Sequence, residues 1–137
     1  MVQHFSESED PFLNLYKQAA ERANPPRRNR AQNFEKQRRF YVVYQMIRHV
    51  LDRGSEGDVA ECGCWHGHSA YIIASVLSDK GPRTLWVFDS FEGGLSDKID
   101  QDREAIGDTS PEKTLAKKQH YASNFEQVKA LLAEKTI

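Results

Sequence analysis

Two glycines and an acid give this chain its clearest chemical signal. Gly63 and Gly67 follow Glu61, and they separate a short apolar run from a stretch with helical periodicity. Glycine adopts positive φ and lets other groups approach the backbone closely. A strand, a glycine turn and a helix N-terminus together bring free N–H groups and the positive end of the helix dipole to one point. The pattern therefore predicts a cradle for a nucleotide-like ligand.

A second acid, Asp89, follows the apolar run at residues 84–88. An acid at the tip of the second strand of a βαβ unit is placed to accept hydrogen bonds from ribose hydroxyls. The interval between Glu61 and Asp89 leaves room for one turn, one helix and one strand. Asp89 is therefore a predicted ribose-binding residue.

The spacing of the glycines narrows the choice of ligand. The dinucleotide fingerprint Gly-x-Gly-x-x-Gly is not met, because three residues stand between Gly63 and Gly67. A Walker A loop is excluded, since no Gly-Lys-Ser/Thr follows. An NAD-binding domain is therefore disfavoured. Many S-adenosylmethionine-dependent methyltransferases carry acid-x-Gly-x-Gly-x-Gly at this point, and Trp65 occupies the position of the middle glycine.

The elements around the turn predict an open α/β sheet. Residues 59–62 are predicted to form a short buried strand, residues 84–88 a second strand, and residues 69–80 the helix between them. The predicted elements follow the order helices, strand, helix, strand, helices. This order is typical of the first part of an open α/β sheet with right-handed crossovers. We therefore expect a Rossmann-like, three-layer αβα fold that is incomplete, with N-terminal helices and an exposed strand edge.

The N-terminal part predicts two helices. Asp10 and Pro11 are typical of an N-cap and a first helical position. Apolar residues recur at helical spacing through residues 34–53, and Gly54 is typical of a C-terminal stop. We predict a helical extension and basic connector at residues 1–33, followed by the N-terminal half of a cofactor-binding domain at residues 34–137.

The C-terminal part predicts further helices. Thr109 to about Tyr121 is predicted to form a short helix, and Ser123 to open a second one through a capping box. The second helix is expected to turn four apolar residues inward: Phe125, Val128, Leu131 and Leu132. A third strand could begin at residues 135–137.

Composition limits the class of protein. The chain has 137 residues and a formal net charge of −1, which does not indicate nucleic-acid binding. No apolar run approaches the ~18 residues of a membrane span, and residues 1–10 lack the features of a signal peptide. The only two cysteines, Cys62 and Cys64, are consistent with a reducing compartment. We therefore expect a cytoplasmic protein. The basic run Arg27–Arg39 is interpreted as a solvated helix face or as a surface for an anionic substrate.

Two motifs resemble those of the macrocin O-methyltransferase (TylF) family. They are Val-Ala-Glu-Cys-Gly-Cys-Trp-His-Gly-His-Ser at residues 59–69 and Leu-Trp-Val-Phe-Asp-Ser-Phe-Glu-Gly at residues 85–93. The resemblance spans about residues 40–130. The chain departs from the family at His68, where a second glycine is usual, and at residues 94–96, where Leu-Pro is common.

The resemblance implies S-adenosyl-L-methionine as cofactor. Gly63 and Gly67 would pack the turn against its methionine part, and Glu61 would hold the turn or the amino group. Asp89 would accept from the ribose hydroxyls, and Ser69 would cap the helix and reach the carboxylate. The full implied cofactor-binding set is Glu61, Gly63, Cys64, Trp65, Gly67, Ser69, Asp89, Ser90 and Phe91, the last two beside the adenine.

The resemblance also implies an enzyme that methylates a hydroxyl of a sugar or related small molecule. The family is implied to bind Mg²⁺ through aspartate motifs that these 137 residues do not contain, so no catalytic residue or metal ligand is assigned. The alternative is a non-catalytic module that binds the cofactor or assembles with a partner. The N-terminal helices and the exposed sheet edge are candidate surfaces for a homo-oligomer.

The cysteines, histidines and aromatic residues of the turn have alternative interpretations. Cys62, Cys64, His66 and His68 are all zinc-ligand types, although their spacing is unusual for zinc. Either histidine could instead be a catalytic base, or a neutral, solvent-facing residue at the helix N-terminus. Cys62 could be a small core residue. Trp65 and Phe91 could flank the cofactor or serve ordinary packing.

Overall fold

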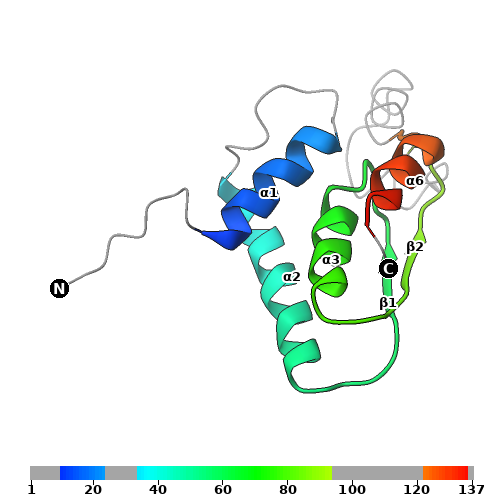
Figure 1. The fold of residues 1–137 in the computed structure, drawn as a ribbon. Helices are drawn as coiled ribbons and strands as arrows, with labels where there is room; N and C mark the ends of the chain where they lie inside the picture. The colour runs from blue at the N-terminus through cyan, green and yellow to red at the C-terminus, as the bar shows by residue number, and fades with distance from the viewer. Residues whose placement is uncertain (1–9, 24–33, 94–121, 136–137) are drawn as a thin grey trace, which may run out of the picture.

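The computed structural model describes residues 10–23, 34–93 and 122–135. These residues form four helices and two parallel strands (Figure 1). In chain order the elements are α1 (Pro11–Arg22), α2 (Phe34–Asp52), β1 (Val59–Cys62), α3 (His68–Ser78), β2 (Leu85–Phe88) and α6 (Phe125–Ala133). The predicted helix at residues 109–121 lies outside the described residues, and so do residues 136–137, where a third strand could begin.

The two strands form the predicted βαβ unit. β1 and β2 pair in parallel, with Val59 opposite Leu85 and Cys62 opposite Phe88. Helix α3 makes the crossover between them. Leu85 and Val87 pack against buried residues of α3 and α6, so both helices cover the same face of the sheet (Figure 1).

The opposite face of the sheet is open to solvent. Ala60 and Cys62 on β1 are exposed, and Trp86 and Phe88 on β2 expose 54% and 57% of their surface. The predictions of a fully buried first strand and of a core Cys62 are wrong, because helices cover only one side of the sheet in the part of the chain that the structure describes. Within that part, two of the three expected layers are present.

Helix α1 begins where the sequence predicts. Asp10 is the N-cap, and its Oδ1 accepts hydrogen bonds from the N–H groups of Phe12 (2.8 Å) and Leu13 (3.2 Å). Pro11 occupies the first helical position, where its missing N–H costs no helical hydrogen bond. Helix α2 begins at the predicted residue, Phe34, and ends at Asp52, one residue before the predicted end. Gly54 follows it with φ 69°.

The helices share one hydrophobic core. Phe12, Tyr16 and Ala19 on α1 are buried. They join buried residues of α2, α3 and α6 in one cluster, completed by Ala23, Tyr44, Tyr71, Ile72, Val76 and Leu131. The boundary at residue 33 stays a prediction, and α1 packs on the core rather than forming one of its own.

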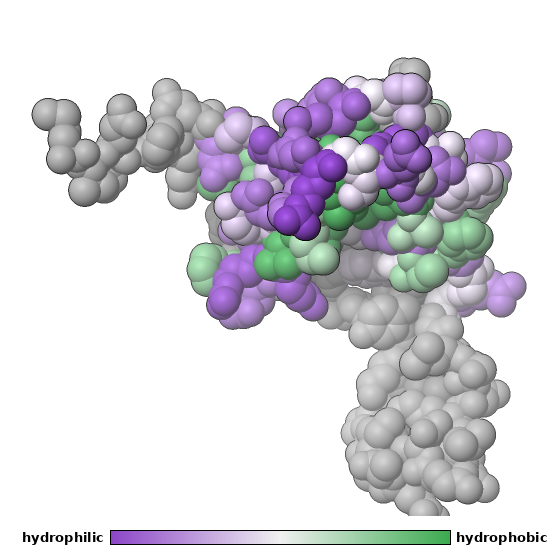
Figure 2. All heavy atoms as spheres, turned by 90° about the horizontal axis from the view of Figure 1, so that it is seen from below, coloured by the Kyte–Doolittle hydropathy of each residue, from purple (hydrophilic) through white to green (hydrophobic). Residues whose placement is uncertain are grey.

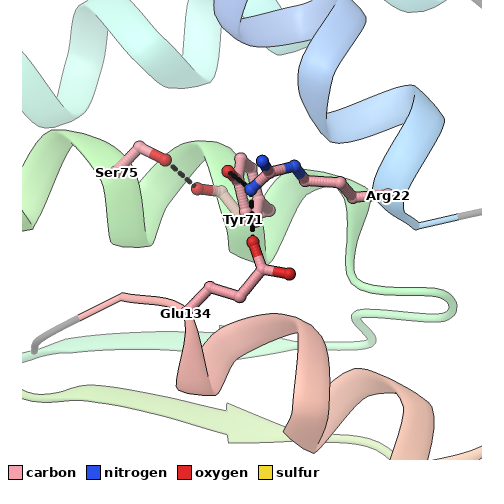
Figure 3. A network of polar contacts seen from close by, with 4 residues as sticks. All are labelled: Arg22, Tyr71, Ser75 and Glu134. Carbon is pink, nitrogen blue, oxygen red and sulfur yellow. Dashed lines mark hydrogen bonds and ion pairs between the residues drawn. The ribbon is translucent and has the colours of Figure 1, made fainter.

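A polar network joins three helices at the end of α1 (Figure 3). The Arg22 Nη1 donates to the Tyr71 hydroxyl at 2.6 Å, and the same guanidinium forms an ion pair with Glu134. The Ser75 hydroxyl donates to the Tyr71 carbonyl at 2.7 Å. Because Arg22 and Glu134 are both about half exposed, the ion pair fixes geometry more than it adds stability.

The N-cap of helix α6 lies one residue later than predicted. Asn124 is the N-cap, and its Oδ1 accepts from the Gln127 N–H at 3.0 Å. Val128 and Leu131 are buried as predicted, whereas Phe125 exposes 52% of its surface. The prediction of an inward Phe125 is therefore wrong. Its ring instead meets Phe91 edge-on, with centroids 5.4 Å apart.

Hydrophilic side chains dominate the face of the molecule seen from below, and hydrophobic ones show as a discontinuous band among them (Figure 2). A search of the described residues finds no helix that is both long enough and apolar enough to cross a membrane.

Candidate cofactor site at the carboxyl ends of the strands

The turn between β1 and α3 begins at Gly63. Its N–H donates to the Phe88 carbonyl at 2.7 Å, which extends the pairing with β2 by one bond. Gly63 has φ 89°, a conformation that side chains of L-residues rarely adopt, and a Cβ placed there would meet nothing within 4 Å. The backbone is therefore open to a ligand at the point where the strand ends.

Asp89 closes the site from the second strand. Its Oδ2 accepts from the Trp65 N–H at 2.8 Å, and its Oδ1 accepts from the Phe91 N–H at 2.9 Å. One carboxylate thus holds the β1–α3 turn and the loop after β2 in a fixed relation. We call this arrangement of Asp89, Trp65 and Phe91 the Asp89 clasp. Cys64 also hydrogen-bonds this carboxylate, so the protein itself uses most of the about four acceptor positions that a carboxylate offers.

Both aromatic members of the clasp have positive φ. Trp65 has φ 52° and Phe91 has φ 58°. Such a conformation costs a non-glycine residue about 1–2 kcal/mol and persists only where surrounding contacts impose it. Here the hydrogen bonds to Asp89 impose it.

Gly67 has a different role from Gly63. It is the N-cap of α3 in the left-handed conformation, with φ 79°, and its carbonyl accepts from the Tyr71 N–H at 2.8 Å. A Cβ placed there would lie 2.9 Å from Leu131 Cδ2 and 3.3 Å from Val128 Cγ1. Gly67 therefore lets α6 approach the start of α3.

The helix starts at His68, one residue before the predicted start. Gly67 caps it without a side-chain hydrogen bond, so the expectation that Ser69 caps the helix is wrong. Ser69 instead bonds the Glu61 carboxyl. Glu61 at the end of β1 and Ser69 in the first turn of α3 therefore lie in contact.

The two acids of the site have opposite electrostatic surroundings. Burial raises the pKa of Glu61, a hydrogen bond from Ser69 opposes this, and the charge of Asp89 raises it further. Burial also acts to raise the pKa of Asp89, but hydrogen bonds from Phe91, Trp65 and Cys64 hold it below its ordinary value. The surroundings of the two acids thus favour the charged form of Asp89 and disfavour that of Glu61. Glu61 Oε2 is buried and has no hydrogen-bond partner within the described ranges.

Cys64 is a buried residue of the turn between β1 and α3. Its Sγ lies 3.8 Å from the Trp65 carbonyl oxygen. Burial, together with the charges of Asp89 and Glu61, raises the pKa of the thiol to about 12. The thiol is therefore protonated at neutral pH and is not a reactive nucleophile.

His68 lies beneath the N-terminal helices instead of facing solvent, so that part of the histidine prediction is wrong. The residue exposes 4% of its surface, and its ring lies against those of Tyr16 and Phe40 at centroid distances of 4.7 and 4.6 Å. Its Nε2 lies 3.2 Å from the Tyr16 carbonyl oxygen. Burial and the charge of Lys36 lower its pKa to about 3, so His68 is neutral, as predicted, and cannot act as a base exposed to substrate.

The alternative of a zinc site is not supported. Cys62 is exposed on the open face of the sheet, while Cys64 and His68 are buried. His66 packs on Trp65, with ring centroids 4.5 Å apart. Across residues 10–23, 34–93 and 122–135, no group of three or more His, Cys, Asp or Glu side chains could hold a metal ion.

Most of the predicted site therefore converges at the carboxyl ends of the two strands. Glu61, Gly63, Trp65, Asp89 and Phe91 gather around the clasp, with Cys64 and Ser69 as supports. Ser90 is exposed beside Asp89. Gly67 borders α6. Sequence reasoning missed His68 as an anchor for the N-terminal helices, although its departure from a usual glycine was the available signal.

Comparisons with known proteins indicate the family of the chain. The family model described as Macrocin-O-methyltransferase (TylF) matches residues 12–135. A demethyldecarbamoylnovobiocin O-methyltransferase of Streptomyces niveus is 33% identical over 58 residues, which are 41% of this chain and 22% of that protein.

A second relative, the 8-demethyl-8-(2,3-dimethoxy-alpha-L-rhamnosyl)-tetracenomycin-C 4'-O-methyltransferase of Streptomyces olivaceus, is 46% identical over 46 residues. These are 32% of this chain and 18% of that protein. The matched segments thus span about a fifth of the length of either relative. No solved structure matches the chain significantly.

Proposed function

The chain belongs to the macrocin O-methyltransferase (TylF) family, and on this basis we propose that it binds S-adenosyl-L-methionine at the Asp89 clasp and serves methyl transfer to a hydroxyl of a sugar-bearing natural product. The family is one of S-adenosylmethionine-dependent O-methyltransferases. The name of the Streptomyces olivaceus relative includes a rhamnosyl group, which supports a sugar hydroxyl as the acceptor.

The observation that carries the proposal is the Asp89 clasp. Hydrogen bonds from Trp65, Phe91 and Cys64 favour the charged form of its carboxylate, which lies at the tip of β2, where an acid of a βαβ unit accepts hydrogen bonds from ribose hydroxyls. The open space beside Gly63 admits the rest of the cofactor next to the backbone. The residues therefore fit a nucleoside with a vicinal diol.

Glu61 supports the same assignment. Its carboxylate carries an oxygen without a partner among residues 10–23, 34–93 and 122–135, close to Ser69 and Asp89. A cationic amino group is a partner that would satisfy this oxygen and stabilise the charged carboxylate. We assign Glu61 to the amino group of the cofactor, directly or through Ser69.

The cofactor, when bound, supplies an activated methyl group whose displacement needs alignment more than covalent help from the protein. The residues described here bind and orient. A sugar hydroxyl also needs a base or a metal ion to lower its pKa. The described ranges hold no cluster that could bind a metal ion, so no residue here is assigned to that step.

The test is calorimetric titration of the chain with S-adenosylhomocysteine, with NAD as the control ligand. We expect saturable binding of S-adenosylhomocysteine alone. Asp89→Ala should weaken it about 10- to 100-fold, the loss expected for hydrogen bonds to a charged group. Asp79→Ala, which removes an exposed acid at the C-cap of α3, is the matched control and should leave binding unchanged.

A second titration separates recognition from disruption of the clasp. A 2′-deoxy analogue of S-adenosylhomocysteine should bind more weakly to the wild type but should lose little further affinity on Asp89→Ala. Equal losses for both ligands would show that Asp89 acts only on the turn. No binding by the folded chain would refute the site, and binding without methyl transfer would favour the non-catalytic module.

A further inference from the structure

The first residue of α3 connects the cofactor turn to the N-terminal helices. His68 follows Gly67, the N-cap at the end of the turn, and its ring lies in the core against Tyr16 of α1 and Phe40 of α2. We propose that His68 is a positioning residue of the cofactor site, through which the attachment of α1 and the binding of S-adenosyl-L-methionine stabilise each other. This coupling rests on the proposed function, since it concerns the same site.

The backbone of His68 belongs to the cradle. The first N–H groups of an α-helix have no partner within the helix, and in α3 the first N–H that bonds back is that of Tyr71, which donates to the Gly67 carbonyl at 2.8 Å. The N–H groups of His68, Ser69 and Ala70 therefore project from the start of the helix toward the turn. They are the donors that allow the turn to hold a polar or anionic group of a ligand.

The side chain of the same residue is fixed inside the core. Its Nε2 lies 3.2 Å from the Tyr16 carbonyl oxygen. Because a carbonyl oxygen only accepts, the neutral ring carries its proton on Nε2 and donates it to α1. His68 thus presents a backbone donor to the cradle and a side chain to α1 and α2. A shift of α1 therefore moves the start of α3 and the donors that it carries.

The turn needs support from several sides, because its backbone is strained. Trp65 has φ 52°, and such a conformation persists only where the surrounding structure imposes it. Asp89 holds Trp65 from β2, and Gly67 borders α6. His68 supplies the attachment to α1 and α2. Without it, a smaller fraction of folded chains would hold the turn ready for the cofactor, and the apparent affinity would fall by that fraction.

Stability alone does not explain a histidine at this position. The Nδ1 of the ring is buried and has no hydrogen-bond partner within the part of the chain that the structure describes. A buried polar atom without a partner costs free energy. A phenylalanine ring would fill the same space without that cost, but it would lose the bond to Tyr16. The bond that distinguishes histidine from phenylalanine is therefore the one that orients α1 on the start of α3.

Calorimetric titration of the full chain with S-adenosylhomocysteine tests the coupling. His68→Phe keeps a ring but removes the donor, and we expect it to weaken binding about 3- to 10-fold, the effect of one hydrogen bond. His68→Gln places an amide N–H near the position of Nε2 and should restore the affinity to within about 2-fold of the wild type.

Val76→Ala separates positioning from a loss of stability. Val76 exposes 5% of its surface in the same core, about two turns further along α3. This variant should destabilise the chain but bind S-adenosylhomocysteine as the wild type does, at a temperature where far-UV circular dichroism shows both to be folded. If His68→Phe behaves in the same way, His68 has only a structural role and the coupling is overturned.

The end of α1 tests the path from the other direction. Arg22 ties α1 to Tyr71 and Glu134 and lies outside the predicted cofactor-binding set. Arg22→Met should weaken binding about 3-fold by loosening α1. In the His68→Phe background it should weaken binding little further, because the connection to the turn is already lost. Losses that simply add would overturn a coupling through His68.

The wild type distinguishes this coupling from the proposed function. A folded wild type that does not bind S-adenosylhomocysteine would overturn the proposed function and the coupling with it. Saturable binding by the wild type, with equal affinity in His68→Phe, would overturn the coupling alone. If His68→Phe does not fold, Arg22→Met decides, and an unchanged affinity in that variant would overturn the coupling.

Discussion

Replacing Gly67 by alanine isolates the contact between α6 and the start of α3. The new Cβ would lie 2.9 Å from Leu131 Cδ2 and 3.3 Å from Val128 Cγ1, at a residue with φ 79°. The positive φ costs about 1–2 kcal/mol for a residue with a side chain. Overpacking of a well-packed contact adds about 1–3 kcal/mol. We therefore expect Gly67→Ala to lower the free energy of unfolding by about 2–5 kcal/mol.

Gly54→Ala is the matched control for this substitution. Gly54 has φ 69°, close to that of Gly67, but a Cβ there would meet nothing within 4 Å. It should therefore show the conformational cost alone, about 1–2 kcal/mol. Urea unfolding at 25 °C, followed by far-UV circular dichroism, measures both variants.

A double variant then tests the clash itself. Leu131→Ala removes the atom nearest to the new Cβ, so the cost of Gly67→Ala should fall by about 1–2 kcal/mol in that background. The reasoning is refuted if Gly67→Ala costs no more than Gly54→Ala. It is also refuted if the effects of Gly67→Ala and Leu131→Ala simply add.

Two further predictions concern the buried side chains of the site. Because the pKa of His68 is lowered to about 3, the unfolded chain takes up a proton below pH 6.5 that the folded chain does not, and stability falls as pH decreases. His68→Phe should remove about 2 kcal/mol of the difference in stability between pH 7 and pH 5, measured by urea unfolding; an unchanged pH dependence would contradict a buried neutral His68. In the folded chain, one of the two thiols should react rapidly with a disulfide reagent at pH 8, and Cys62→Ser should abolish that reaction, because Cys64 is buried with a pKa of about 12; two fast thiols would contradict this.

Features set by neighbouring residues could be predicted from the sequence. The cap at Asp10, both strands and the position of Asp89 were all predicted, because each depends on a few adjacent residues. The start of α3 and the cap of α6 were each off by one residue, since serine and glycine or asparagine compete as caps at neighbouring positions.

Features set by distant residues could not be predicted in this way. The positions of His68 and Phe125 depend on which helix lies against them, and the exposure of Cys62 depends on which face of the sheet is covered. The positive φ of Trp65 arises from a hydrogen bond to Asp89, 24 residues later in the chain. Periodicity within one segment carries no information on such contacts.

The anchoring of α1 also bears on the order of folding. Arg22 reaches Tyr71 and Glu134, which are 49 and 112 residues away in the chain, whereas the clasp and the strand pairing join residues separated by about one βαβ unit. Contacts that close long loops are slow to form, because the entropy of closure must be overcome before the contact stabilises the chain. We therefore expect the turn and the two strands to assemble first. Helix α1 then packs over His68 late in folding.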